Sequence, residues 1–389
     1  MLGTDIGLRE ITFSPSNSEI LIMWDKLIHI IPTLLDLLAL STCIGVLGCR
    51  LWVLPPEMKS MNALDSEALL TRLWQLLAVC IMLLILSGTL LLATRAAEMS
   101  SLSVVAILPV LPKVLFKTHY GQMWLLRAVA MIVLWIGWLL GRQRLDSQAI
   151  PAFMLGFGAI IAFTRSASSH ASDAGDLRLP ELMDWLHLMA ASFWGGGLLI
   201  LTTIVLPIVI KQANNSLILF ANIAGRFSTL AGVALAGILL TGVYNALFEV
   251  GSFQALWQTP YGQTLIAKLL LLLTLIFLGA SNRYISVPLL QQWADHPLIK
   301  RGVIYNLFLA RYVTSVQRKL DGTQLARQFM HKVWIEAILI VAVLICAALL
   351  QHEVPARHFL NVGHEHAMQK SEIVEKKTSV GQGFDRSAK

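Results

Sequence analysis

The chain has 389 residues, of which 56% are hydrophobic and 14% are charged, and its mean hydropathy is +0.68. Soluble domains carry about 25% charged residues, so this composition excludes an ordinary soluble protein and requires lipid as solvent for much of the surface. The basic residues behind the net charge of +7 lie in loops between apolar runs. This favours the positive-inside distribution of a membrane protein over a nucleic-acid partner. The four cysteines form no CxxC pair, which argues against a disulfide framework.

Apolar runs of about 20 residues recur along the chain and predict transmembrane helices. The predicted spans are 24–53, 70–95, 120–141, 150–166, 181–210, 226–248, 261–284 and 331–351. The run 102–115 is too short to span and predicts an interfacial or re-entrant piece. Residues 285–330 predict an amphipathic helix on the membrane surface. The fold class is therefore an all-α integral membrane protein with about eight transmembrane helices.

The distribution of basic residues predicts the orientation. Loops after the odd-numbered spans hold 15 Lys and Arg, and the other side holds 7 without the long tail. Because basic loops remain in the cytoplasm, both termini are predicted on the outer side of the membrane. The first 20 residues are mixed and polar, so we expect no cleavable signal peptide. The chain divides into a tail 1–23, a membrane half 24–168, a second half 169–351 with a cytoplasmic loop 285–330, and a polar periplasmic tail 352–389.

The two halves share motifs in the same order. Residues 118–122 read THYGQ, and Arg127 follows the Gln five positions later. Residues 259–263 read TPYGQ, and Lys268 follows the Gln at the same distance. In a second match, Arg72 precedes Ser87-Gly88 by 15 positions, as Arg226 precedes Thr241-Gly242. In a third, Asp25 and His29 open the first span, as Asp184 and His187 open the fifth. These matches predict two parallel four-helix repeats, and sites in such proteins often lie at the repeat interface. Compositional likeness between membrane helices is the alternative.

On this topology eight of the ten histidines lie at the outer face. Imidazole binds copper well, and thioether sulfur favours Cu(I). The predicted metal ligands are His187, His170, His29, His352 and Met183, with Asp184 and Asp25 as carboxylates that orient the rings. Met183 and His187 are four residues apart and share a helix face. A single histidine at a helix end is more often an interfacial residue than a ligand, so this alternative stays open.

Several catalytic signatures are absent from the sequence. It contains no GxxxxGK[ST] phosphate loop, no GxSxG elbow and no HExxH pair. We therefore expect neither nucleotide-driven pumping by this chain alone nor hydrolysis, and we expect that the protein is not an enzyme.

Three ordered blocks resemble the copper resistance protein D (CopD) family. The first is Ser169-His170-Ala171 with DWLHLMAASFWGGGL at 184–198, the second is RFS at 226–228 with LTGVYNA at 240–246, and the third is TPYG at 259–262 with Lys268 and Asn282-Arg283. The resemblance is strong over residues 165–351 and general over the first half. The longer first half, the polar loop after the seventh span and the Lys-rich tail depart from the family pattern.

The resemblance implies an inner-membrane protein of about eight helices that takes part in copper homeostasis. Such proteins are described as moving copper from periplasm to cytoplasm, often beside a periplasmic copper-binding partner of the CopC type. His170 and His187 match the family's histidines by position. We thus expect a copper permease that lies in the lipid bilayer and receives copper at a periplasmic mouth. The alternatives are a haem-binding electron carrier with paired histidines and a structural membrane protein without metal.

Overall fold

The computed structural model describes residues 17–54, 63–101, 106–168, 178–211, 216–293 and 322–354. Within these ranges the chain is helical and contains no strand. Eight helices of this part are long and apolar enough to cross a membrane. The predicted all-α membrane fold is therefore confirmed.

The first half contributes four spans and one short helix. Its elements are α1 (Asn17–Gly48) with the π-helical turn η1 (Cys49–Val53), α2 (Ala63–Ser100), α3 (Leu111–Lys117), α4 (His119–Gly141) and α5 (Ala149–Ser166). The second half opens with a continuous span made of α6 (Leu179–Ala191), η5 (Ser192–Gly196), α7 (Gly197–Ile200), η6 (Leu201–Val205) and α8 (Leu206–Ile210). It continues with α9 (Ser216–Val250), α10 (Ala255–Gln258), α11 (Pro260–Ser281), η7 (Asn282–Ser286), α12 (Val287–Trp293) and α14 (Gly322–Leu350).

Several helices run past their predicted ends. Helix α2 begins at residue 63 rather than 70, and α9 begins at 216 rather than 226. Residues 285–293 were predicted in a surface loop, but they continue the seventh span as η7 and α12. The centre of that loop, 294–321, lies outside the described residues. Apolarity marks only the lipid-embedded part of a helix, and a helix continues into the polar boundary without an apolar signal.

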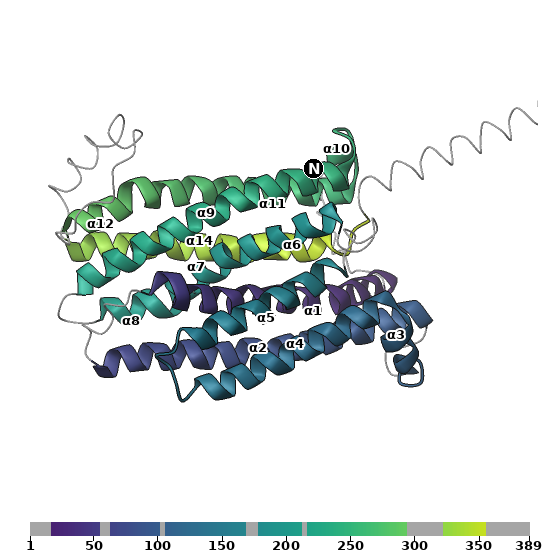
Figure 1. Cartoon of the computed structure of the whole chain (residues 1–389). Helices are drawn as coiled ribbons and strands as arrows, with labels where there is room; N and C mark the ends of the chain where they lie inside the picture. The colour runs from purple at the N-terminus through teal and green to yellow at the C-terminus, as the bar shows by residue number, and fades with distance from the viewer. Residues whose placement is uncertain are drawn as a thin grey trace, which may run out of the picture.

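The two halves pack through their first spans. Within an 18-residue window, 67% of the α1 span and 61% of the α6–α8 span are buried inside the protein, against 17% for α9 and 11% for α11–α12. In Figure 1 the helices α2 and α4 lie on one side of α1, and α9 and α11 lie on the other side of the bundle. The two inner spans thus form the centre, and α9 and α11–α12 lie mostly at the periphery.

Small residues permit this central contact. Ser192 Oγ lies 3.4 Å from Ser41 Oγ. A Cβ atom on Gly196 would lie 1.8 Å from the carbonyl oxygen of Ser41, and one on Gly45 would lie 2.3 Å from the carbonyl carbon of Gly196. Backbone therefore meets backbone between α1 and η5, as small residues allow in membrane bundles. The interface between the halves is closed at this level.

The repeated THYGQ and TPYGQ motifs adopt the same local structure. Thr118 and Thr259 both have φ −111°, and each hydroxyl accepts from the glycine N–H three residues on at 3.0 Å. Each motif follows a short helix, α3 or α10, and begins a span. Figure 1 shows α3 and α10 at one end of the bundle and α8 and α12 at the other. We call the end with α3 and α10 the histidine end, because His29, His119 and His352 lie there.

Candidate functional site

Two histidines from opposite ends of the chain meet at the histidine end. His29 lies in the first turn of the α1 span, and His352 lies two residues after α14. Their ring centroids are 6.1 Å apart, with the planes inclined by 50°. Glu98 near the end of α2 places Oε1 3.2 Å from His29 Nδ1. The site thus joins α1 and α2 of the first half to the end of the second half.

Thr33 fixes the orientation of His352. Its hydroxyl donates to the carbonyl oxygen of His29 at 3.0 Å, and the same oxygen lies 2.8 Å from His352 Nε2. Because the hydroxyl proton is already engaged, Nε2–H of His352 donates to Thr33 and a neutral ring keeps its lone pair on Nδ1. Burial lowers the pKa of His352, as do the nearby His29 and Arg165. The imidazole is therefore neutral at neutral pH, the form that binds metal.

The site is partly open to solvent. The side chains of His29 and Glu98 are 23% and 42% exposed. Two imidazoles that share one ion at the ~2 Å bond length usual for such ligands place their ring centroids no more than about 6.4 Å apart. The observed separation meets this limit. Nitrogen donors with a neighbouring carboxylate suit a copper ion.

A buried ionic cluster lies about two helical turns further along α1 from His29, toward the opposite end of the bundle. Asp36 is fully buried and accepts from Ser87 Oγ at 2.8 Å and from Arg165 Nη1 at 2.6 Å. Arg127 also donates to Asp36, and Arg165 also donates to Gln351, the residue before His352. One carboxylate and two guanidinium groups give a net charge of +1. Buried charges require such pairing because the interior does not solvate them.

His187 lies in a second polar cluster, in the other half. Thr241 Oγ1 donates to the carbonyl oxygen of Gly237 at 2.6 Å and lies 3.0 Å from His187 Nδ1. By the same reasoning Nδ1–H of His187 donates to Thr241, which leaves Nε2 unprotonated. The ammonium of Lys268 interacts electrostatically with His187 and with Asp184. This cluster repeats the first one, because Thr241 matches Ser87 and Lys268 matches Arg127.

The structure corrects one part of the repeat. The sequence paired His187 with His29, but the hydrogen bonds to Thr241 and Ser87 place His187 where the first half has Asp36. The pairing was wrong because it matched residue types near the helix starts, whereas the matching positions are set by contacts to the neighbouring helix. Asp36 and Arg165 were missed, although an aspartate inside an apolar run is itself a functional signal.

The predicted ligands do not come together as one cluster among the described residues. His29 and His352 meet, whereas the polar contacts of His187 lie on α9 and α11. Met183 is half-buried on α6, and Asp184 accepts from Ser166 Oγ at 2.8 Å. His170 and the side chain of Asp25 lie outside the described residues. Within the described ranges no group of three or more His, Cys, Asp or Glu is arranged to hold a metal ion.

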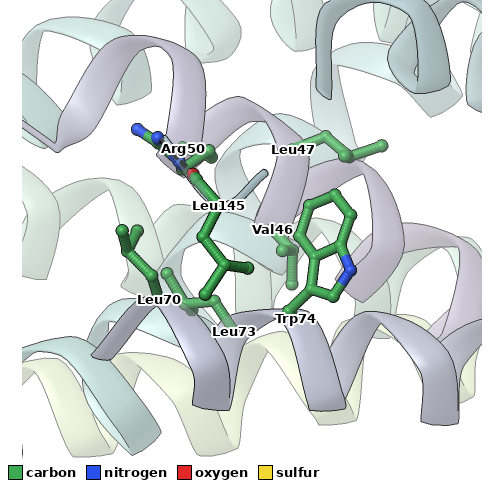
Figure 2. A pocket seen from close by; sticks show the side chains of 7 residues that line it. All are labelled: Val46, Leu47, Arg50, Leu70, Leu73, Trp74 and Leu145. Atoms are coloured by element: carbon green, nitrogen blue, oxygen red, sulfur yellow. Dashed lines mark hydrogen bonds between the residues drawn. The ribbon is translucent and has the colours of Figure 1, made fainter. Parts of the chain in front are cut away.

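The opposite end of the bundle contains a small cavity (Figure 2). Its volume is about 10 Å³, and Arg50 beside it donates to the carbonyl oxygen of Leu145 at 2.8 Å. The remaining lining is Val46, Leu47, Leu70, Leu73 and Trp74. A space of this size holds about one water molecule, so this cavity is too small for haem.

Comparison with protein families covers both halves of the chain. Residues 23–179 match the model of the copper resistance protein D-like N-terminal domain, and residues 221–350 match the model of copper resistance protein D. The chain belongs to the copper resistance protein D family. No solved structure matches it.

Several curated proteins are similar to this family member. It is 29% identical over 43% of its length to "Copper transport protein CutJ" of Bacillus subtilis (strain 168), and this match covers 30% of that protein. It is 25% identical over 54% of its length to "Inner membrane protein YebZ" of Escherichia coli (strain K12), of which 70% is covered. It is 25% identical over 50% of its length to "Copper resistance protein D" of Pseudomonas syringae pv. tomato, of which 63% is covered.

Proposed function

We propose that the protein takes up copper from the periplasm and passes it across the bacterial inner membrane, without catalysing a chemical conversion. The observation that carries this proposal is the His29–His352 pair, with ring centroids 6.1 Å apart at one end of a membrane bundle. The relatives named for copper transport and copper resistance support copper as the cargo. The relative named an inner membrane protein supports the location.

The histidine end is the receiving face in this proposal. The excess of Lys and Arg in the loops at the opposite end supports a cytoplasmic location for that end, so in this proposal the histidine end and both termini face the periplasm. A periplasmic copper-binding protein of the CopC type would deliver copper to His29 and His352. His187 and Met183 in the second half, together with His170, would provide further ligands, with Asp184 and Asp25 as orienting carboxylates.

Haem binding by paired histidines is the alternative. The same His29–His352 pair would then provide axial ligands on both sides of an iron. A visible spectrum of the purified protein separates the two functions, because bis-histidine haem gives a strong Soret band and bound copper does not. A Soret band lost on replacing His29 and His352 by alanine would support haem and contradict the copper proposal.

Copper accumulation by cells tests the proposal. Cells that express the wild type should accumulate more copper than cells that express the His29→Ala, His352→Ala double variant. His331→Ala is the matched control, because His331 is an exposed histidine on α14, in the turns nearest the opposite end. Equal accumulation by wild type and double variant, at equal membrane abundance, would contradict uptake through the histidine end.

A further inference from the structure

Two buried cysteines lie on the neighbouring helices α1 and α2 inside the membrane part of the first half. Cys43 on α1 is 0% exposed and Cys80 on α2 is 3% exposed. The hydrogen bond between Ser87 and Asp36 sets the register of these two antiparallel helices. Seven residues, about two helical turns, lead from Asp36 to Cys43 and, in the opposite chain direction, from Ser87 to Cys80. The two thiols therefore lie at the same level, and they interact electrostatically.

We propose that Cys43 and Cys80 form a Cu(I) site within the membrane. The inference rests on the proposed function, in which copper is the cargo, and adds a ligand pair below the periplasmic mouth. Soft thiolate ligands select Cu(I) over harder metal ions. His29, Asp36 and Cys43 recur every seven residues along α1, so one face of this helix leads from the outer histidines past the ionic cluster to the cysteine pair.

The nearby ionic cluster compensates the charge of such a site. A Cu⁺ ion that displaces the protons of both thiols forms a bis-thiolate complex with a charge of −1 and releases two protons. The cluster of Asp36, Arg127 and Arg165 carries +1 and lies about 10 Å away along α1. Both arginine Nε atoms are buried without a hydrogen-bond partner among the described residues. In a medium of low dielectric constant this positive charge favours the anionic complex over the free ion.

The pair is a property of the first half alone. With the register that matches Asp36 to His187 and Ser87 to Thr241, the positions of Cys43 and Cys80 are occupied in the second half by Trp194 and Ala234. The other described cysteines have different surroundings: Cys49 Sγ lies 3.8 Å from the carbonyl oxygen of Gly197, and Cys346 lies near Lys268 on α11. They are matched controls for a site that requires two facing thiols.

An anaerobic Cu(I) titration of the full-length protein in detergent tests the proposal. Bicinchoninate competes for Cu(I), and the number of ions retained per protein is measured for wild type and for the Cys43→Ser, Cys80→Ser double variant. We expect the double variant to retain one Cu(I) fewer and to lose the ultraviolet thiolate-to-Cu(I) absorption, whereas Cys49→Ser and Cys346→Ser retain the wild-type number. Equal retention by wild type and double variant would overturn the proposal.

A measurement on the wild type alone covers the case in which the double variant does not fold. X-ray absorption at the copper edge of the Cu(I)-loaded protein should show sulfur neighbours at direct Cu–S bonding distance. A spectrum that contains only nitrogen and oxygen neighbours would overturn the cysteine site. If cellular accumulation still depends on His29 and His352 in that case, the proposed function stands and only the cysteine site fails.

Discussion

Asp36 and His187 occupy matching places in the two halves of the bundle. Ser87 on α2 bonds to Asp36, and Thr241 on α9 bonds to His187. The first place holds a carboxylate between two arginines, whereas the second holds an imidazole that keeps one ring nitrogen unprotonated. The two halves thus differ at this place: the first carries a closed ionic cluster and the second a potential metal ligand.

Replacing Asp36 should destabilise the protein more than replacing its hydroxyl donor. Asp36→Asn leaves Arg127 and Arg165 buried without their counter-charge, and removal of one partner from a buried pair costs about 3–5 kcal/mol. Ser87→Ala removes one hydrogen bond and should cost about 1 kcal/mol. Thermal unfolding in detergent measures both. Equal effects of the two substitutions would show that the ion pairs do not hold the first half together.

A methyl group at the central crossing should separate the halves. A Cβ on Gly196 would lie 1.8 Å from backbone oxygen of Ser41, and overpacking of this kind costs about 1–3 kcal/mol. Gly156 on α5 has no atom within 4 Å of the corresponding Cβ position. Gly196→Ala should therefore lower the unfolding temperature, whereas Gly156→Ala should leave it unchanged or raise it. An unchanged Gly196→Ala variant would contradict the backbone contact between α1 and η5.

The two threonine caps should contribute equally. Thr118 and Thr259 have the same backbone angles and the same 3.0 Å bond from a glycine N–H, and loss of such a cap costs about 1 kcal/mol. Thr118→Ala and Thr259→Ala should lower the free energy of unfolding by similar amounts. A large effect in one half with none in the other would argue against equivalent roles in the two repeats.

His352 should titrate below the ordinary range of histidine. Burial, and then His29 and Arg165, lower its pKa from 6.5. The folded protein therefore takes up this proton at a lower pH than the unfolded chain does. Stability is unaffected well above pH 6.5, falls as the pH drops below 6.5, and reaches its full loss below the folded pKa.

A chemical-shift titration of the His352 ring measures this pKa. Glu98 partly opposes the shift, so Glu98→Gln should lower the midpoint further. A midpoint at or above 6.5 in the wild type would contradict the buried position of the ring beside Arg165.

The sequence predicted those features that depend on local composition. Apolar length locates the spans, and the threonine-glycine motifs locate two helix starts, because each is a property of neighbouring residues. It did not predict that Asp36 matches His187, because that relation depends on hydrogen bonds between helices far apart in the chain. The His29–His352 contact follows from the return of α14 to α1, which the predicted topology allowed but could not place to within a few ångströms.

Copper binding by the purified protein tests the central claim most directly. Wild type and the His29→Ala, His352→Ala double variant are equilibrated with copper in detergent, and retained copper is counted per protein, with His331→Ala as the control. We predict that the double variant retains fewer ions and that the control matches the wild type. Equal copper retention by all three folded proteins would contradict a copper site between His29 and His352.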